Sequence, residues 1–294
     1  MISEVAVVSG KGGTGKTTIT AAFAALAKDI AIADCDVDAP DLHILLQPEI
    51  QFTDDFVASK VAVIDPDSCT MCGLCEEKCR YDAIHLPEID RIACEGCGVC
   101  EYICPVGAIQ MEDKVSGVVH TSTTRFGPMA HARLHAGEGN SGKIVTEVRK
   151  LAIQLAKRHA KNLVLIDGSP GIGCPVIATV TGVRLAIIVT EPTMSGIHDM
   201  ERVLSLMHQF RVTPMVIVNK YDLNPDNTVM IEDYCHQEGI EVLGKIPFDP
   251  IMTKSMVAAK TLPEFAPDHP ITETLEAMWR RIESRLSEVA GARS

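Results

Sequence analysis

The segment Gly10 to Thr18, GKGGTGKTT, holds the glycines, lysines and hydroxyl groups that a phosphate-binding loop needs. It satisfies the pattern G-x-x-x-x-G-K-[ST], follows an apolar run that predicts a strand, and opens a segment that predicts a helix. Glycines let backbone N–H groups turn toward phosphates, and a helix N-terminus adds partial positive charge. The pattern predicts a nucleoside triphosphate site in which Lys16 reaches the β- and γ-phosphates and Thr17 binds Mg²⁺. The alternative is a glycine-rich turn that binds nothing. The residues expected in the cradle are Gly10, Lys11, Gly12, Gly13, Thr14, Gly15, Lys16, Thr17 and Thr18.

Carboxylates follow two apolar runs that predict strands. The stretch DCDVDAPD supplies Asp34, Asp36, Asp38 and Asp41. Further along, Asp167 ends the run LVLID. The carboxyl edge of a parallel sheet is where ligands of such folds bind, so these side chains are placed to meet the phosphates. We expect Thr17, Asp36 and Asp167 to hold Mg²⁺, with Asp167 acting through water. A plain solvated acidic loop is the alternative for the first stretch.

Eight of the eleven cysteines form two C-x₂-C-x₂-C-x₃-C runs at a fixed offset of 25 residues. Thiolates at this spacing wrap one cubane, and in two-cluster ferredoxins the fourth cysteine of each run serves the other cluster. The segment resembles bacterial ferredoxins of that kind throughout its length. The resemblance implies one 4Fe–4S cluster on Cys69, Cys72, Cys75 and Cys104, and a second on Cys94, Cys97, Cys100 and Cys79. Zinc is the alternative, but the triple spacing fits its tetrahedral sites poorly.

The second run departs from the first at one position, because Pro105 follows its last cysteine whereas Arg80 follows Cys79. Arg80 would either raise the potential of a neighbouring cluster or lie on the surface. Outside the runs, Cys174 is expected to be a buried thiol, with a cluster shared between subunits as the alternative. The remaining two cysteines, Cys35 and Cys235, are expected in the core.

The second lysine of the phosphate loop carries a further resemblance. KGGTGKTT is similar to the deviant loop of the MinD/Mrp/ParA and nitrogenase-iron-protein ATPases. This resemblance implies that Lys11 reaches across a two-fold homodimer to the partner's nucleotide, with ATP at the interface. It also implies that Asp36 orients or deprotonates the attacking water, with Asp38 as the second choice.

Three later segments fit the same resemblance. Gly171, within Gly168 to Gly173, is expected in a switch that senses the γ-phosphate. Asn219 and Lys220, at the end of VIVNK, are expected beside the base, and Pro247 in GKIPFDP is expected under the adenine. A strand-end asparagine that only caps a turn is the alternative for Asn219.

Uniformly apolar runs alternate with helical patterns, which predicts a doubly wound α/β domain with a mostly parallel sheet. The expected strands are Glu4–Ser9, Ile30–Asp34, Leu163–Asp167, Leu185–Thr190 and Pro214–Lys220. The expected helices are Lys16–Lys28, Gly142–His159, Ser195–Phe210, Thr228–Glu238 and Ile271–Val289.

We expect residues 65–112 to be an inserted α+β ferredoxin-like domain, with residues 1–64 and 113–294 forming the ATPase domain. Arg125 to Lys143 lacks periodicity and predicts a loop; its histidines and His120 are expected to be scattered on the surface, with a metal site as the alternative.

The net charge of the chain limits the classes of partner that it is expected to bind. The 294 residues carry a formal net charge of −12, which disfavours nucleic acid and anionic membrane surfaces. The first residues lack a basic leader and no run reaches transmembrane length, so we expect a cytoplasmic protein without membrane insertion. Reduced cytosolic thiols favour metal ligands over disulfides.

Together these features predict an ATPase whose nucleotide-dependent dimer is coupled to electron transfer, with ATP/ADP, Mg²⁺ and two 4Fe–4S clusters as cofactors. Its partner would be a redox or iron–sulfur protein. An iron–sulfur carrier or scaffold is the first alternative. Its relatives share a labile cluster through a C-x-x-C pair near the C-terminus, and no such pair occurs here. A positioning ATPase of the MinD or ParA kind is the second alternative.

Overall fold

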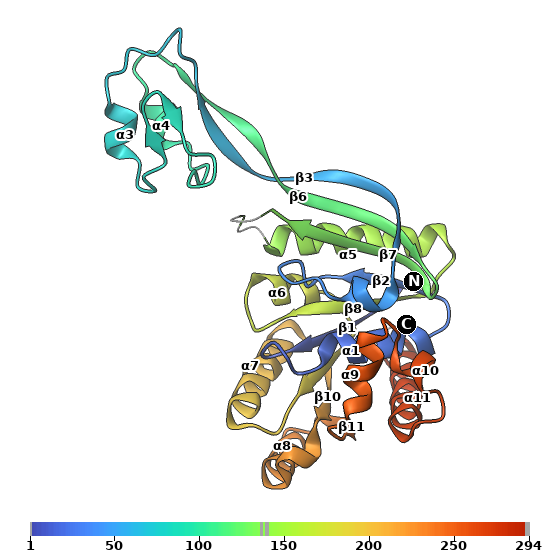
Figure 1. Cartoon of the computed structure of the whole chain (residues 1–294). Helices are drawn as coiled ribbons and strands as arrows, with labels where there is room; N and C mark the ends of the chain where they lie inside the picture. Colours follow the sequence, from blue (N-terminus) through green and yellow to red (C-terminus); the bar gives the residue numbers. More distant parts are fainter. Residues whose placement is uncertain (1, 136–137, 139–140, 292–294) are drawn as a thin grey trace. The chain divides into compact units, whose positions relative to one another are not determined.

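A nine-stranded sheet forms the centre of the fold (Figure 1). The computed structural model describes residues 2–135, 138 and 141–291. The strand order is β11-β10-β9-β1-β8-β2-β7-β6-β3, and neighbouring strands from β11 to β7 are parallel. The strands are β1 Ser3–Ser9, β2 Ile30–Asp34, β3 Glu49–Ile64, β4 Ile84–His85, β5 Glu88–Ile89, β6 Ile109–Thr124, β7 Gly127–Leu134, β8 Leu163–Pro170, β9 Leu185–Thr190, β10 Thr213–Asn219 and β11 Glu241–Ile246.

Helices cover both faces of the parallel part of this sheet (Figure 1). The helices of the described chain, of which α3 and α4 lie in the cysteine-rich segment and not on this sheet, are α1 Lys16–Leu26, α2 Leu42–Leu46, α3 Leu74–Lys78, α4 Val99–Ile103, α5 Ser141–Arg158, α6 Cys174–Val180, α7 Met194–Phe210, α8 Pro225–Gln237, α9 Pro250–Val257, α10 Leu262–Phe265 and α11 Pro270–Gly291, with a 3₁₀ turn η1 Tyr221–Leu223. One layer contains α1, α2, α10 and α11, and the other contains α5, α6, α7 and α8. No helix in the described part of the chain is long and apolar enough to cross a membrane.

The core lies where the uniformly apolar strands meet the helices. Every residue of β2 and β9 is buried, which explains why these strands show no alternation in the sequence. On the α1 face, Phe23 packs against Trp279 of α11 with ring centroids 5.4 Å apart. The predicted α/β class with a mostly parallel sheet is confirmed, and the five expected strands and five expected helices are present with small shifts at their ends.

Six strands of the described chain were not predicted: β3, β4, β5, β6, β7 and β11. β3 and β6 carry mixed polar and apolar residues, and β7 contains Gly127 and Pro128, so none shows a uniform apolar run. The prediction of a loop over Arg125 to Lys143 is therefore wrong for its first part, where β7 pairs with β2. Residues 136–137 and 139–140 of that segment lie outside the described residues.

The outer strands reverse the direction of the sheet. Ser122 of β6 contacts His131 of β7, and the backbone N–H of His135 donates to Ser116, so β6 runs antiparallel to β7. In the same way, side-chain pairs Thr53–His120 and Ser59–Ser116 show that β3 runs antiparallel to β6.

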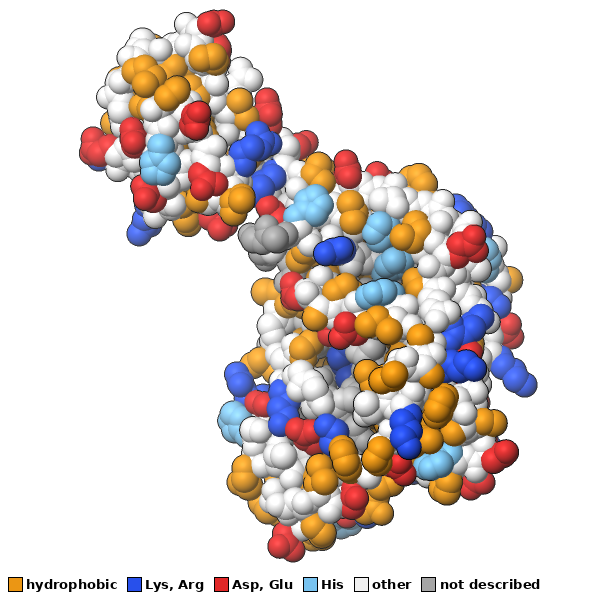
Figure 2. Space-filling model, in the orientation of Figure 1, with side chains coloured by type: hydrophobic (Ala, Val, Ile, Leu, Met, Phe, Trp, Pro, Cys, Tyr) orange, Lys and Arg blue, Asp and Glu red, His pale blue; other side chains and the backbone are white. Residues whose placement is uncertain are grey.

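The chain divides into two compact units. Unit 1 comprises Met1–Thr53, Val119–Ala132 and Ser141–Ser294; unit 2 comprises Asp54–Val118 and Arg133–Asn140. The segment 65–112 lies within unit 2, which also contains the ends of β3 and β6. Unit 2 holds 14 acidic and 6 basic residues, so it carries −8 of the net charge of −12. Figure 2 shows acidic side chains over the visible face of this unit.

The internal repeat of the sequence is also a repeat of structure within unit 2. Helices α3 and α4 begin at equivalent positions, after Gly73 with φ 78° and Gly98 with φ 74°. The two halves are joined reciprocally, because the N–H of Asp65 donates to Ala108 and the N–H of Asp90 donates to Ala83. Each half therefore begins where the other half ends.

Candidate nucleotide site and cysteine cavities

The phosphate loop connects β1 to α1 at the carboxyl edge of the sheet. Gly13 and Gly15 have φ values of 79° and 88°, a region that favours glycine. A Cβ atom at Gly15 would collide with the side-chain amide of Asn219, whereas Gly12 and Gly13 border open space. Glycine is thus required both for the turn and for close packing beneath it.

The lysine, threonine and aspartate predicted to bind phosphate and Mg²⁺ lie together. Lys16 Nζ is 2.8 Å from Asp167 Oδ1 and 3.4 Å from Asp36 Oδ2. Thr17 Oγ1 donates to Asp167 Oδ2 at 2.9 Å. A hydroxyl and a carboxylate side by side are the oxygen ligands that Mg²⁺ prefers, so these residues fit the expected ion.

Burial and mutual charge control the protonation of this group. The Lys16 side chain loses hydration by burial, but the carboxylates of Asp167 and Asp36 outweigh that loss and raise the pKa of Lys16. Burial also raises the pKa of Asp36, against the opposing effect of Lys16. Asp34 is fully buried, and burial together with Asp167 raises its pKa well above its usual range. Asp34 accepts from the backbone N–H of Asp36 at 3.2 Å, so it helps to fix the position of that residue.

Lys11 is held by side chains of its own chain. Its Nζ lies 2.6 Å from Glu191 Oε1 and 3.2 Å from the hydroxyl oxygens of both Thr193 and Ser195. The other oxygen of Glu191 pairs with Lys220 at 3.1 Å. Glu191 comes from the end of a distant strand, and nothing in the sequence pattern indicated that it would meet the loop.

The residues expected near the base lie beneath and beside the loop. Asn219 Nδ2 donates to the carbonyl of Thr14 at 2.7 Å, and Lys220 Nζ donates to that of Gly13 at 3.1 Å. Both residues therefore support the loop through its carbonyl groups. Pro247 also borders the site, after the end of β11.

A cavity of about 580 Å³ opens over the loop. Among the predicted residues it is lined by Gly12, Gly13, Thr14, Gly15, Lys16, Thr17, Thr18, Asp36, Asp38, Asn219, Lys220 and Pro247. Gly10, Lys11, Asp167 and Gly171 do not line it. One wall of the cavity, formed by Phe248, Met252 and Met256, was not predicted from the sequence. The volume and the polar floor suit a nucleotide-sized ligand.

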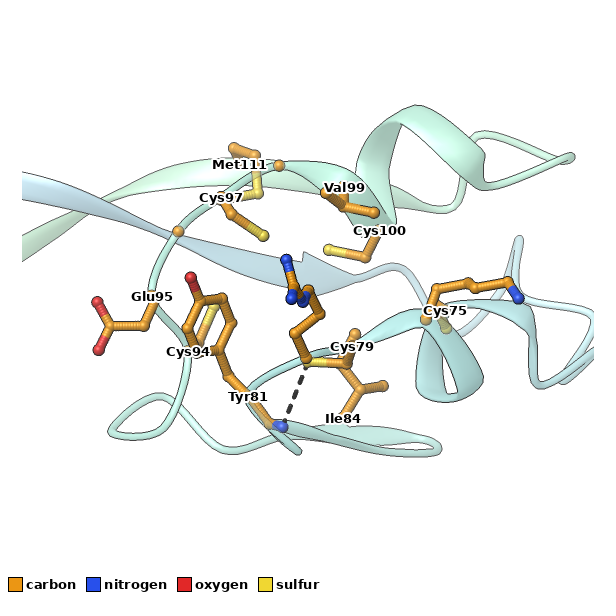
Figure 3. Close-up of a pocket in the computed structure, with 15 residues that line it drawn as sticks. Cys75, Cys79, Tyr81, Ile84, Cys94, Glu95, Cys97, Val99, Cys100 and Met111 are labelled. Carbon is orange, nitrogen blue, oxygen red and sulfur yellow. Dashed lines mark hydrogen bonds between the residues drawn. The ribbon is translucent and has the colours of Figure 1, made fainter.

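The eight cysteines of the repeat border two cavities within unit 2. The larger cavity, of about 220 Å³, is lined by Cys79, Cys94, Cys97 and Cys100, with Cys75 at its margin (Figure 3). The smaller cavity, of about 20 Å³, is lined by Cys69, Cys72, Cys75 and Cys104. We refer to these two groups of four as the Cys94 set and the Cys69 set. Each set brings three cysteines of one run together with the fourth cysteine of the other run.

Backbone donors face the sulfur atoms of both exchanged cysteines. The N–H of Ala83 donates to Cys79 Sγ at 3.4 Å, which Figure 3 marks with a dashed line, and the N–H of Ala108 donates to Cys104 Sγ at 3.3 Å. Backbone hydrogen bonds lower the pKa of the Cys104 thiol. Such donors favour the thiolate form that binds metal.

The cysteine sets suit a group larger than one ion. Within the described residues, no three His, Cys, Asp or Glu side chains converge where a single metal ion could bind. A cubane takes four thiolate ligands, and the Cys69 set and the Cys94 set each bring four cysteines to the edge of one cavity.

The positions of the remaining cysteines and of two histidines differ in part from those predicted from the sequence. Cys35 and Cys235 are fully buried, as predicted. Cys174, predicted to be buried, is exposed because it begins α6 at the surface. His120 and His131 are not scattered, since their rings lie against each other with centroids 4.9 Å apart and planes tilted by 37°. Burial lowers the pKa of His131 to about 4.

Comparison with known proteins defines the class. Residues 5–262 match CbiA, the CobQ/CobB/MinD/ParA nucleotide binding domain, and the chain belongs to this family of P-loop ATPases. An uncharacterized protein of Methanocaldococcus jannaschii is 36% identical over 230 residues, covering 77% of this chain and 81% of the relative.

More distant relatives carry functional names. A protein of Pyrococcus horikoshii named iron–sulfur cluster carrier protein is 23% identical over 266 residues, covering 84% of this chain and 74% of the relative. The structure of the septum site-determining protein MinD of Pyrococcus horikoshii, in complex with Mg-ADP, superposes with a TM-score of 0.57 at 16% identity. The match covers 100% of this chain and 99% of that one. At this identity the likeness establishes the fold.

Proposed function

We propose that this protein is an ATP-binding and ATP-hydrolysing iron–sulfur protein, in which a nucleotide-dependent homodimer is coupled to electron transfer through two 4Fe–4S clusters. The observation that carries this proposal is the formation of two cavities in unit 2, each lined by three cysteines of one run and the fourth of the other. The same chain holds a phosphate loop whose Lys16 and Thr17 meet Asp167. We propose residues 65–112 as the ferredoxin-like part of unit 2.

Nucleotide binding uses the residues that line the large cavity of unit 1. The backbone N–H groups from Gly10 to Thr18 surround the phosphates, and Lys16 leaves its carboxylate partners for the β- and γ-phosphates. Thr17, Asp36 and Asp167 would hold Mg²⁺, which would supply positive charge beside the phosphates. Asn219, Lys220 and Pro247 border the base, and Gly171 lies in the segment that senses the γ-phosphate.

Hydrolysis transfers the terminal phosphoryl group to water. Asp36 orients the attacking water and accepts its proton, the bond from the γ-phosphorus to the bridging oxygen breaks, and ADP leaves. Burial supports this role because it raises the pKa of the Asp36 carboxyl and so strengthens it as a base. Lys11 supplies the positive charge that stabilises the partner's leaving group, for which it must first leave Glu191.

The cysteine sets supply thiolate ligands, and each bound 4Fe–4S cluster would provide a one-electron carrier. The chain itself supports these ligands with N–H donors and with the two matched helices that begin after Gly73 and Gly98. The strongly acidic composition of unit 2 favours a redox partner with a basic docking surface.

A second candidate function is the delivery of clusters to other proteins. One relative is named an iron–sulfur cluster carrier protein, and one cysteine in each set, Cys72 and Cys97, is exposed. Retention is favoured because six of the eight cysteines are at least partly buried and both sets are complete in four ligands.

The deciding experiment is anaerobic purification with iron and sulfide quantification, followed by an EPR-monitored redox titration with and without Mg-ATP. We expect two 4Fe–4S clusters per chain and a change in potential or spectrum on adding Mg-ATP. The Lys16→Ala variant is the control, because it should bind the clusters but lose the response to nucleotide. Transfer of clusters to an apo-ferredoxin would favour the carrier function, and a protein without iron would reject both.

A further inference from the structure

The two cysteine cavities can be compared position by position, because the internal repeat relates residues 25 apart. Where the smaller cavity has Pro105, the larger cavity has Arg80. The larger cavity is also bordered by Lys78 and Glu95, whereas none of the residues lining the smaller one, all within the described part of the chain, is charged. The repeat has therefore diverged in charge around one set of ligands.

Arg80 is the cation that distinguishes the larger cavity. The charge of Lys78 is offset by Glu77, whose Oε1 lies 2.7 Å from its Nζ. Among the described residues, no carboxylate lies within ion-pair distance of Arg80. Glu95 borders the same cavity and opposes Arg80 in part, but it does not form an ion pair with it. Positive charge near a cluster favours its reduced form, because reduction adds one negative charge.

Hydrogen bonds to sulfur act in the opposite direction. The Cys69 set receives the N–H of Met71 at Cys69 and the N–H of Ala108 at Cys104, at 3.5 and 3.3 Å. The Cys94 set receives the N–H of Ala83 at Cys79, at 3.4 Å. Backbone N–H groups of Val106 and Gly107 also interact with Cys104. These neutral donors favour reduction at the Cys69 set, and the full positive charge of Arg80 at the Cys94 set opposes them.

We infer that the two cluster sites are inequivalent, and that Arg80 makes the site of the Cys94 set the first to accept an electron from a low-potential one-electron donor. This inference rests on the proposed function, because both sets must hold 4Fe–4S clusters. The donor loses one electron, and the net charge at the Cys94 set becomes more negative by one. The site of the Cys69 set then has the lower potential of the two.

The test is an EPR-monitored redox titration of the anaerobically purified full chain, with dithionite and mediators as the reductant. Cys72→Ser and Cys97→Ser variants assign the signals, since each removes one ligand from one set. In the wild type, the cluster of the Cys94 set should be reduced at the more positive potential. Arg80→Gln should shift the reduced-to-oxidised ratio of this cluster about two- to fivefold toward the oxidised form, the size expected of a solvent-exposed charge.

The repeat supplies matched controls. Arg80→Pro installs the residue that the other half carries and should act like Arg80→Gln, whereas Pro105→Arg should raise the potential of the Cys69 set instead. Two clusters with one common midpoint, or no shift in Arg80→Gln, would overturn the inference and leave the proposed function standing. A chain without iron would overturn the proposed function itself.

Discussion

Lys11 is confined by its own chain before any partner arrives. Glu191, Thr193 and Ser195 all contact its ammonium group. A lysine that must stabilise phosphates in a second subunit has to give up these contacts. Under the proposed trans role, the ion pair with Glu191 would oppose dimer formation, and nucleotide binding would have to provide the compensating interaction.

Replacing Glu191 by Gln should make ATP-dependent dimerisation easier. The carboxylate loses hydration by burial, yet hydrogen bonds from Lys11 and Lys220 lower the pKa of Glu191, so it is charged at neutral pH. Removing this charge should lower the ATP concentration needed for half-maximal dimer about two- to fivefold. Sedimentation with Mg-ATP measures the change, with nucleotide affinity determined in parallel. Glu232→Gln, which removes the remote pair with Lys245, is the control and should have no effect.

Asp36 and Asp38 can be separated by substitution. Both residues line the nucleotide cavity, but only Asp36 has its Oδ2 atom 3.4 Å from Lys16 Nζ. Burial raises the pKa of the Asp36 carboxyl group. Asp36→Asn should reduce ATP hydrolysis about 10²- to 10⁴-fold, the usual contribution of a general base, while ATP still binds. Asp38→Asn should retain most activity. Steady-state phosphate release and nucleotide titration distinguish the two; the reverse ranking would assign the role to Asp38.

Among individual residues, the sequence predicts those that belong to a motif with a fixed spacing along the chain. The cysteine runs and the phosphate loop define their own geometry, because each motif is continuous in the chain. The sequence did not predict Glu191 or the wall that contains Phe248. Both are far from the phosphate loop in the sequence and come close to it only in the folded chain. Cys174 was misjudged for a similar reason: its exposure depends on how α6 lies, which the residue type does not reveal.

Among the elements, β2 and β9 were predictable because both faces of each strand are buried. β3 has a largely exposed N-terminal half, and its sequence there is indistinguishable from a polar loop. β7 begins with Gly127, whose close approach to the Ile30 backbone leaves no room for a Cβ. Glycine and proline usually indicate a turn, so tertiary contact has overridden the local signal.

The turn between β6 and β7 is fixed by Arg125. Its guanidinium donates to the carbonyls of Leu45 and Leu46 at 2.7 and 2.9 Å, and to Glu264 Oε2 at 2.7 Å. Thr261 donates to the same carboxylate. One arginine thus links the turn, the end of α2 and the start of α10 within unit 1.

Glu264 should make this link sensitive to acid. Burial alone would raise the pKa of Glu264, but hydrogen bonds from Arg125 and Thr261 outweigh it and lower the pKa to about 2. Because the folded-state pKa is lowered, the stabilisation is complete above the unfolded value of about 4.3 and is lost as pH falls toward about 2. Glu264→Gln should lower Tm at pH 7 and show a smaller loss of Tm between pH 4.5 and 2.5 than the wild type. Thermal denaturation of both proteins, with Glu288→Gln as the surface control, checks this.

On the scale of the whole molecule, one chain combines the nucleotide-binding domain of the CobQ/CobB/MinD/ParA family with a cysteine-rich unit of high negative charge. The strands β3 and β6 contribute residues to both units, so the connection between them is two paired strands and not a single linker. Two hydrogen-bonded strands transmit a change in position more faithfully than a flexible chain does.

The dimer itself can be tested by complementation between two inactive variants. Lys11→Ala keeps its own Asp36 but cannot supply the partner's lysine, whereas Asp36→Asn supplies Lys11 but cannot activate water. Each variant alone should hydrolyse ATP at a small fraction of the wild-type rate. In a mixed dimer, the Lys11→Ala subunit has an intact Asp36 and receives Lys11 from the other subunit, so one of the two sites becomes active. An equal mixture should therefore recover roughly a quarter of wild-type activity, since about half of the dimers are mixed and each has one working site.

Phosphate release measured across mixing ratios checks this expectation, with activity reaching its maximum at the equal mixture. A mixture of Lys16→Ala with Lys11→Ala is a second informative pair. The Lys16→Ala subunit still carries Lys11, but it should not bind the nucleotide that its own side of the dimer interface needs. Recovery in this pair should be weaker than with Asp36→Asn. If Lys11 acted on the nucleotide of its own chain, no mixture of Lys11→Ala with Asp36→Asn would regain activity at any ratio, since neither subunit would contain a complete site.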